Sequence, residues 1–286
     1  MIIITLSFLV LCSYAYGSVK LVQDGKCSHK IVLNPEASPS EKHAGKELQV
    51  HIKACTGSEV PILNEMPNEN APIIVLGCGS VTRKLGINPD PEQLGEQGFL
   101  LKTQGQNIII AGSKEAGTLY GVHRFLERYF GVRWYAPSVT KTPRIDNLVV
   151  PDTDQIVKPA FLYRHVSYTL PGGDSDFFAR IGQNAGKGDA NNPHGIQYEF
   201  LGTCHSYFRF ISPDEYFDTH PEYFSEIGGI RRRDDTQLCL TNPDVLEIVT
   251  KKMLDYMDKY PNIRQFNFSQ MDYYNYCECP KCKAIN

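Results

Sequence analysis

Residues 98–131 read GFLLKTQGQNIIIAGSKEAGTLYGVHRFLERYFG and decide the fold of the first half of the chain. Two apolar runs, 98–103 and 107–112, flank a Gln-Gly-Gln turn, which is typical of a β-hairpin. Residues 113–130 then place their large apolar side chains on one helical face, and Gly131 is a typical helix stop. The stretch therefore predicts two paired strands followed by an amphipathic helix.

The residues upstream supply a second helix and further strands. Short apolar runs at 30–33 and 73–76 predict buried strands. Ser38 before a proline, with a glutamate close behind, is typical of a helix start, and apolar residues at three-to-four spacing then run to Gly57. We therefore expect residues 18–150 to form a small α/β sandwich domain, with two helices on a mixed sheet.

The first residues predict export. Residues 2–16 are almost wholly apolar, and this run is too short for a membrane span. Ala15-Tyr16-Gly17 supplies the small-x-small pattern that signal peptidase requires, so residues 1–17 are expected to be a signal peptide. A buried N-terminal strand or helix is the alternative. We expect a secreted or periplasmic protein without a membrane span after cleavage.

The composition excludes several classes of protein. The chain has 286 residues, of which 42% are hydrophobic and 21% charged, so it is globular rather than disordered, collagen-like or coiled-coil. Its formal net charge is −3 at pH 7, which provides no global field that would hold a polyanion against salt. Nucleic acid is therefore not an expected partner. The three arginines at 231–233, beside two aspartates, are interpreted as a solvated turn.

A proline-rich stretch separates two regions of different pattern. Its prolines are Pro137, Pro143, Pro151 and Pro159. We expect a domain boundary here, with a linker at 151–158. Strand-like runs then begin at 161, 200, 237 and 265, and helical stretches alternate with them; the clearest of these begins after an N-cap at Asn242. This alternation predicts parallel strands with helical crossovers in residues 159–286.

Residues 112–137, GSKEAGTLYGVHRFLERYFGVRWYAP, resemble the end of the N-terminal domain of bacterial alpha-glucuronidases of glycoside hydrolase family 67. The domain that precedes the barrel of beta-hexosaminidases is similar. Residues 44–57 also fit the first helix of the family 67 domain, so the resemblance covers nearly all of residues 20–150. It implies a domain that packs against a barrel and contributes no catalytic residue.

Residues 159–286 resemble the start of an uncharacterised domain that follows this module in secreted bacterial proteins. The matching motifs are Cys204-His-Ser206, His220-Pro-Glu-Tyr-Phe224, Gln237-Leu-Cys-Leu-Thr-Asn-Pro243 and Cys277-Glu-Cys-Pro-Lys-Cys282. The resemblance implies a (β/α)₈ barrel, or TIM barrel, of glycoside hydrolase type. A complete barrel needs about 200 residues or more, so we expect a C-terminally truncated fragment that holds the first half of a barrel.

Side chains at the C-terminal ends of barrel strands form the active site in this fold. The expected substrate-binding residues at these ends are Arg164, His165, His205, Asn242 and Gln270, with Tyr273 beside them. Arg164 matches the position of an arginine that grips sugars in hexosaminidase-type barrels, and its planar fork suits a uronate carboxylate. A salt bridge within the barrel is the alternative use of Arg164.

Glycoside hydrolysis needs two carboxyl groups, about 5 to 9.5 Å apart. Asp272 is the acid in a strand-end position, and Glu222, in a loop or helix start, is the next catalytic candidate. Either residue could instead cap a helix. Tyr273, Tyr274 and Tyr276 beside Asp272 are typical of a surface that stacks on sugar rings, with core packing as the alternative.

A cysteine cluster lies near residue 280. Cys277, Cys279 and Cys282 could give three thiolates to a structural zinc ion, with a fourth ligand from elsewhere in the chain. The candidates for that fourth ligand are Cys239, Cys204 and His205. In an exported protein, a disulfide between Cys279 and Cys282 or between Cys239 and Cys277, or free buried thiols, are the competing interpretations. No other cofactor is expected.

Together these features predict a secreted carbohydrate-active protein. The leading hypothesis is a glycoside hydrolase, alpha-glucuronidase-like or hexosaminidase-like, that acts on uronate- or amino-sugar-bearing polysaccharides. A non-catalytic glycan-binding protein or inactive fragment would keep Arg164, His205 and the tyrosines but lack the acid pair. A zinc-dependent hydrolase is a third possibility.

Overall fold

The chain folds into two compact units in the computed structural model, residues 1–197 (unit 1) and residues 198–286 (unit 2). The structure describes residues 17–68, 71–113, 116–166, 175–184, 192–195, 200–201, 204–261, 263 and 265–285. Residues 1–16 of the expected signal peptide lie outside the described residues. None of the described helices is both long enough and apolar enough to cross a bilayer.

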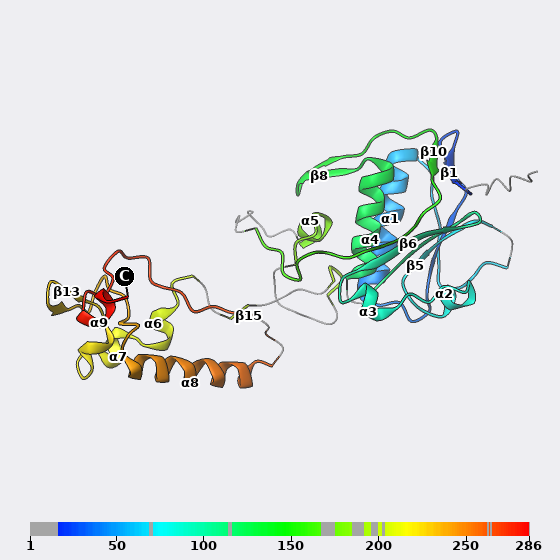
Figure 1. Ribbon diagram of the computed structural model, residues 1–286. Helices are drawn as coiled ribbons and strands as arrows, with labels where there is room; N and C mark the ends of the chain where they lie inside the picture. Colours follow the sequence, from blue (N-terminus) through cyan, green and yellow to red (C-terminus); the bar gives the residue numbers. More distant parts are fainter. Residues whose placement is uncertain are drawn as a thin grey trace, which may run out of the picture. The chain divides into compact units, whose positions relative to one another are not determined.

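A six-stranded mixed sheet forms the centre of unit 1 (Figure 1). In order across the sheet, its strands are β11 (Asp154–Val157), β6 (Phe99–Gln104), β7 (Asn107–Gly112), β5 (Ile73–Leu76), β3 (Lys30–Leu33) and β4 (Ile62–Leu63). Strand β3 pairs in parallel with β4 and β5, and β5 with β7, whereas β6 is antiparallel to β7 and β11. The expected hairpin, upstream strands and mixed sheet are confirmed.

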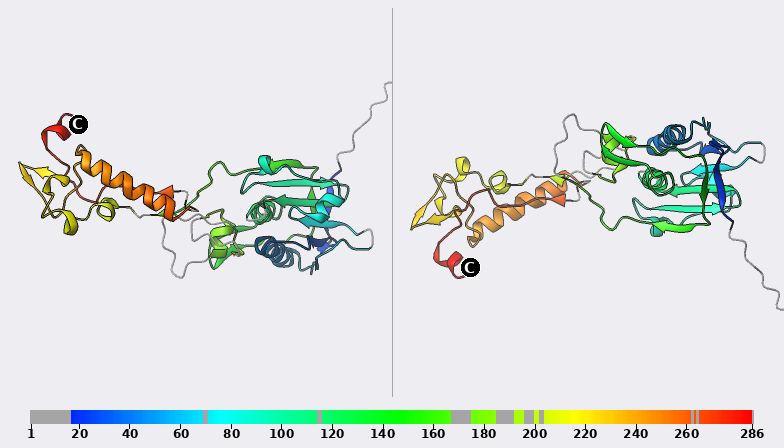
Figure 2. Two further views of the ribbon diagram at one scale, coloured as in Figure 1. Left: turned by 90° about the horizontal axis from the view of Figure 1, so that it is seen from below. Right: turned by 90° about the horizontal axis from the view of Figure 1, so that it is seen from above.

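Both faces of this sheet are covered. Helices α1 (Pro39–Thr56) and α4 (Gly117–Phe125) lie side by side over one face, where they pack on Ile31 and Ile74 (Figures 1 and 2). The alternate side chains, such as Val32, belong to a second core with Val81 from the short helix α2 (Ser80–Lys84). Burial on both faces explains why the strands are unbroken apolar runs rather than alternating ones.

Helix α1 begins and ends where its sequence predicts. The Ser38 hydroxyl accepts from the Glu41 backbone N–H at 3.2 Å, and the Glu41 carboxylate accepts from the Ser38 N–H at 2.8 Å, which forms a capping box. Gly57 ends the helix in the left-handed region at φ 81°, where glycine carries no steric cost.

The second helix is shorter than expected. Residues 113–130 were predicted to be helical, but α4 begins at Gly117 and passes into a π-helical turn at Leu126–Phe130 that Gly131 ends at φ 68°. Gly121 lies where α4 crosses the hairpin, and a Cβ built there would be 2.5 Å from Ile110 Cγ2. The absence of a side chain at Gly121 therefore allows the helix to approach the sheet closely.

The expected linker at 151–158 forms part of the domain instead. Residues Asp154–Val157 are strand β11, which pairs with β6 along four residues and forms an edge of the main sheet. The flanking prolines and polar residues resemble a linker because an edge strand tolerates both. Residues 148–150 form β10 (Leu148–Val150), which joins β1 (Val19–Gln23) and β2 (Lys26–Cys27) in a second, three-stranded sheet.

The four expected barrel strands are only partly present. Residues 161–164 are not a strand, and residues 237–242 contribute one antiparallel bridge between Phe224 and Leu238. The other two runs give β12 (Phe200–Leu201) and β15 (Gln265–Phe266), which pair in parallel. The mixed α/β class is confirmed, but the described residues do not form half of a barrel. Parallel strands occur almost only in sheets that are covered on both faces.

Most of the described elements of unit 2 are short. They are α6 (Tyr207–Phe210), α7 (Pro213–Tyr216), the 3₁₀ turn η2 (Pro221–Tyr223), the hairpin β13 (Glu226–Ile227) and β14 (Ile230–Arg231), and α9 (Pro280–Lys283). The long helix α8 (Pro243–Lys259) buries Val245 and Val249 against an aromatic core that includes Phe210 and Phe224. Helix α8 begins directly after the expected N-cap at Asn242.

A buried ionic network joins α5 (Ser175–Arg180) to the helices of unit 1. The Arg180 guanidinium donates to both carboxylate oxygens of Glu47 at 2.8 Å, and His123 Nε2 lies 3.4 Å from the same carboxylate. Burial acts to raise the pKa of Glu47, but hydrogen bonds from Arg180 and His123 outweigh it and hold that pKa well below its usual range. The pair therefore stays ionised inside the protein.

We expect unit 1 to lose stability as the pH falls from 7.5 to 5. Burial lowers the pKa of His51 and His123, so the unfolded chain binds protons below about 6.5 that the folded chain does not. Each histidine then costs up to about 1.4 kcal/mol per pH unit. The fluorescence of Trp134, the single tryptophan, reports unfolding of unit 1, and His123→Gln should flatten the pH dependence. Equal stability at both pH values would contradict this expectation.

Candidate functional site

The sequence-predicted residues fall into both units. Arg164 and His165 lie in unit 1, and His165 is exposed. The Arg164 guanidinium donates to the carbonyls of Phe161 and Gly182, each at 2.6 Å, and lies 5.3 Å from the centre of the Tyr120 ring. The Arg164 side chain therefore links Phe161 to Gly182 through their backbone carbonyls, rather than forming the salt bridge that was the alternative.

A cavity of about 380 Å³ adjoins Arg164 in unit 1. Its lining includes four arginines, Arg124, Arg133, Arg164 and Arg180, with Tyr120 and Trp134. Each arginine already donates to a protein group: Arg180 to Glu47, Arg124 to the Glu127 carboxylate, and Arg133 to the Glu127 carbonyl. Each of the four guanidinium groups thus already uses part of its hydrogen-bonding capacity within the fold.

The remaining predicted residues lie in unit 2, where the parallel strands bring two of them together. Because β12 and β15 are parallel neighbours, the segments that follow them emerge at the same edge. His205 Nδ1 lies 3.2 Å from the Gln270 carbonyl, and the His205 N–H donates to Ser269 Oγ at 3.0 Å. His205 and Gln270 are both exposed, as a binding role requires.

His205 has a strained backbone. Its φ is 63°, in the left-handed region that a residue with a side chain seldom adopts. Such a conformation costs about 1 kcal/mol or more and clusters at functional sites. Two backbone N–H groups, of Ser206 and Tyr207, donate to the Ser269 carbonyl and hold the turn in place.

The segment after β15 is a surface loop, residues 270–276, which we call the tyrosine loop. Buried Gln237 fixes its first half: Gln237 Nε2 donates to the carbonyls of Met271 and Tyr273 at 2.7 Å, and Gln237 Oε1 accepts from the Met271 N–H at 2.9 Å. Sequence reasoning assigned Gln237 to a strand and missed this role, because nothing local distinguishes a clamping amide from a strand residue.

The tyrosine loop presents aromatic rings and one carboxylate to solvent. Tyr273, Tyr274 and Tyr276 are 40%, 94% and 49% exposed, so core packing does not account for them. Asp272 is also exposed, and Gln270 Nε2 donates to the Tyr276 hydroxyl at 3.1 Å. The loop therefore combines flat apolar surfaces with an acid and an amide, which are the groups that contact sugars.

Glu222 and Asn242 are neighbours in unit 2. The Asn242 side chain accepts from the Asp244 N–H at 2.9 Å, which confirms it as the N-cap of α8, and donates to the Glu222 carbonyl at 3.3 Å. Glu222 Oε1 lies 3.1 Å from His220 Nδ1. The side chain of Asn242 is thus engaged at both ends, and the Glu222 carboxylate has a histidine partner.

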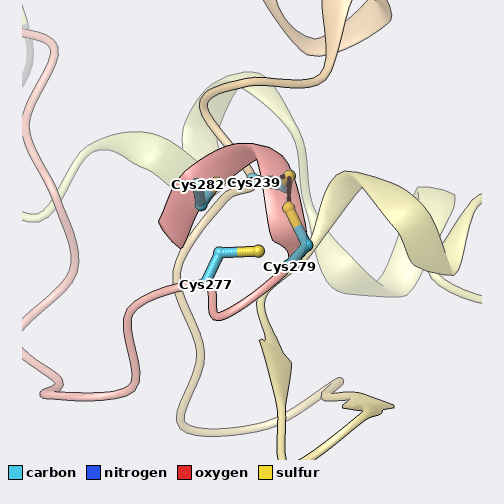
Figure 3. A group of neighbouring side chains, drawn as sticks. All are labelled: Cys239, Cys277, Cys279 and Cys282. Carbon is cyan, nitrogen blue, oxygen red and sulfur yellow. Dashed lines mark hydrogen bonds between the residues drawn. The ribbon is translucent and has the colours of Figure 1, made fainter. Parts of the chain in front are cut away.

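Four cysteines converge beside the tyrosine loop (Figure 3). The sulfurs of Cys239, Cys277, Cys279 and Cys282 all lie within 4.8 Å of one another. Of the three candidates for the fourth ligand, Cys239 is therefore the one that lies in the cluster. Every described cysteine is a free thiol. Burial raises the pKa of the Cys277 thiol to about 12.

Arg231 is part of this cluster rather than of a solvated turn. Its guanidinium donates to the Phe224 carbonyl at 2.7 Å, lies 3.3 Å from the Glu226 carboxylate and reaches Cys277 Sγ at 3.6 Å. Arg233, by contrast, pairs with the exposed acids Asp214 and Asp218. The run therefore contains one half-buried arginine that contacts the cysteine cluster and one arginine that pairs with two surface acids.

A second group with metal-binding side chains lies in unit 1. Asp176 Oδ1 is 3.2 Å from His43 Nε2 and 2.7 Å from His194 Nε2. Both imidazoles reach the same carboxylate oxygen, so hydrogen bonding alone satisfies them. The arrangement fastens the first turn of α5 to α1.

Comparison with solved structures finds proteins of similar fold. A family GH115 4-O-methyl-alpha-glucuronidase, with specificity for decorated arabinogalactans, matches with a TM-score of 0.56 at 12% identity. The match covers 87% of this chain and 41% of the chain of that enzyme. The GH20 beta-N-acetylhexosaminidase of Streptomyces coelicolor A3(2) has a TM-score of 0.40 at 13% identity, over 75% of this chain and 38% of its own. At these identities the likeness concerns the fold alone.

Curated relatives match part of the chain. Probable alpha-glucuronidase A of Aspergillus terreus is 29% identical over 109 residues, 36% of this chain, and alpha-glucuronidase A of Emericella nidulans is 31% identical over 101 residues, 34% of this chain. These matches span only 13% and 12% of the two enzymes.

Family models cover nearly the whole described chain. Residues 18–125 match the glycosyl hydrolase family 67 N-terminus, and residues 134–286 match a domain of unknown function, DUF4838. Both resemblances drawn from the sequence are thereby confirmed. The chain belongs to the DUF4838 family, with a glycosyl hydrolase family 67 N-terminal region before that domain.

Proposed function

We propose that this chain is part of a secreted glycoside hydrolase of the alpha-glucuronidase type, and that the tyrosine loop contacts its sugar substrate. The observation that carries the proposal is the meeting of His205 and Gln270 at the ends of two parallel strands, directly before Asp272 and three exposed tyrosines. In barrel enzymes this edge of the sheet is where substrates bind.

The names of the relatives support the choice of substrate. The curated relatives are alpha-glucuronidases, and the solved structure with a TM-score of 0.56 is a 4-O-methyl-alpha-glucuronidase. A uronate-bearing oligosaccharide is therefore the first substrate to test, with an amino-sugar oligosaccharide as the comparison. The two exposed groups that follow the parallel strands, His205 and Gln270, would bind hydroxyls, and Tyr274 would stack on a sugar ring.

Hydrolysis requires two carboxyl groups beside the scissile bond. In this proposal Asp272 supplies one of them, because it is exposed within the tyrosine loop. Glu222 is the second candidate, and its bond to His220 would have to open for it to act.

We expect Tyr274→Ala to weaken binding of a glucuronate-bearing oligosaccharide by about tenfold, since loss of an aromatic stacking face costs roughly 0.5–1.5 kcal/mol beyond area burial. Isothermal titration calorimetry of the whole chain measures this affinity. Tyr135→Ala is the matched control, because Tyr135 is a 65% exposed tyrosine of unit 1 in β8 (Arg133–Ala136). Equal affinities of the two variants, or no binding by the native chain, would refute the assignment.

A non-catalytic glycan-binding protein is the second candidate function. The contact between Glu222 and His220 favours this function, because it occupies one of the two candidate catalytic acids. Asp272, the other candidate, is exposed. The variant Asp272→Asn distinguishes an enzyme from a binding protein. In an enzyme, the rate of sugar release falls by about 10²–10⁴-fold while binding persists. A binding protein releases no sugar before or after the change. Asp234→Asn, an exposed acid of the same unit, is the control.

A further inference from the structure

The four-cysteine cluster is assembled from two distant segments of unit 2. Cys239 lies in the turn before α8, and the others lie around α9, with Cys279 at its N-cap and Cys282 within it. Cys239 and Cys279 are 40 residues apart in sequence. Figure 3 shows the Cys279 side chain pointing toward Cys239 and the Cys277 side chain directed into the group. Three of the four cysteines are buried and Cys282 is half-buried.

The distances between sulfurs match a metal rather than a disulfide. A zinc ion bonds thiolate sulfur at about 2.3 Å in a tetrahedron, which places sulfurs about 3.8 Å apart. Cys239 Sγ lies 3.8 Å from Cys279 Sγ and 3.8 Å from Cys282 Sγ. A disulfide needs about 2.05 Å and joins sulfurs in pairs, whereas here one sulfur is equally distant from two others.

Hydrogen-bond donors surround the sulfurs, as they surround thiolates bound to a metal. The Glu226 N–H and the Arg231 guanidinium reach Cys277 Sγ at 3.5 and 3.6 Å, and the Thr241 hydroxyl lies 3.1 Å from Cys282 Sγ. Four thiolates and one Zn²⁺ carry a net charge of −2, so a nearby guanidinium offsets part of it. Such outer contacts orient metal ligands and adjust their charge.

From this geometry we infer that unit 2 binds one structural zinc ion through Cys239, Cys277, Cys279 and Cys282. All four positions of the tetrahedron are protein sulfurs, so no position remains for water or substrate and the ion has no catalytic role. Zinc holds the segment after the tyrosine loop against the turn that precedes α8. The β13–β14 hairpin joins the same assembly, because the Glu278 N–H donates to the Glu226 carbonyl at 2.7 Å.

Elemental analysis of the whole chain, purified without chelator, tests the inference independently of any sugar chemistry. We expect about one zinc per chain, falling below about one tenth in Cys279→Ser, because a structural site needs its full ligand set. Cys204→Ser is the matched control, since Cys204 is an exposed cysteine of the same unit, and it should keep the metal. Trp134 fluorescence checks that unit 1 is folded in both variants.

Two measurements on the unaltered chain keep the test decisive if unit 2 of the variant does not fold. X-ray absorption at the zinc edge should show four sulfur neighbours at about 2.3 Å, and alkylation should modify Cys204 at once but the four cluster cysteines only after a chelator is added. Iron in place of zinc, nitrogen or oxygen ligands, or a metal-free protein with disulfides among these cysteines would overturn the inference.

Discussion

Replacement of Glu47 by alanine is expected to lower the free energy of unfolding of unit 1 by about 3–5 kcal/mol, the cost of leaving a buried partner charge uncompensated. Glu47 is 6% exposed, accepts two hydrogen bonds from Arg180 and lies beside His123. Its removal leaves the half-buried Arg180 guanidinium without its carboxylate partner, beside the other arginines that line the same cavity, and releases α5 from the helices on which it packs. A loss of this size is a large share of the stability of a typical domain.

Chemical denaturation followed by Trp134 fluorescence measures the effect. Trp134 Nε1 donates to His51 Nε2 at 3.1 Å, within the same part of unit 1. Glu59→Ala is the control: Glu59 also pairs with a cation from α1, Lys53, at 2.6 Å, but both side chains are exposed and no measurable change is expected. Similar unfolding midpoints for the two variants would show that the buried network does not hold unit 1 together.

The same substitution at two helical glycines should have opposite effects. Gly121→Ala in α4 is expected to destabilise unit 1 by about 1–3 kcal/mol, because the added methyl group overpacks the contact with the sheet. Its Cβ would lie 2.5 Å from Ile110 Cγ2 and 3.0 Å from the Phe99 ring. Gly45→Ala in α1 should stabilise by roughly 0.4–1 kcal/mol, because alanine restricts the unfolded chain and favours helix.

Gly45 differs only in its surroundings. A Cβ there would meet Leu33 Cδ1 at 3.5 Å, an ordinary van der Waals contact. Denaturation midpoints of the two variants, read from Trp134, should therefore move in opposite directions from the native value. Shifts of the same sign would mean that the helix–sheet distance at Gly121 is not set by the missing side chain.

Local signals explain what the sequence predicted well. The capping box of Ser38 and Glu41, the turn at Gly105 and the stop at Gly131 each act within a few residues, so their effects are readable without tertiary information. The same holds for the N-cap at Asn242, which marks the start of α8. Helices and hairpins defined this way are confirmed.

Long-range pairing explains what the sequence did not predict. Strand β11 has no pattern of its own and exists because β6 offers an open edge. Gln237 and Arg231 have roles that depend on residues 34 and 46 positions away. The fourth cysteine likewise could not be chosen among Cys239, Cys204 and His205 from spacing, because only the fold brings position 239 to the cluster.

The candidate site was predicted in part. His205 and Gln270 share the end of a parallel strand pair, as the strand assignments implied, whereas Arg164 lies in unit 1 and Asn242 caps a helix. The ends of predicted strands located candidate residues correctly at β12 and β15, where strands form. They did not at 161–164 and 237–242, where no strand forms.

A crystal structure of the whole chain with a glucuronate-bearing oligosaccharide tests the central proposal most directly. We expect density for a sugar ring against Tyr274, with its hydroxyls within hydrogen-bond distance of His205 or Gln270. Density in the cavity beside Arg164, or a sugar bound at any surface away from residues 270–276, would contradict the proposed role of the tyrosine loop.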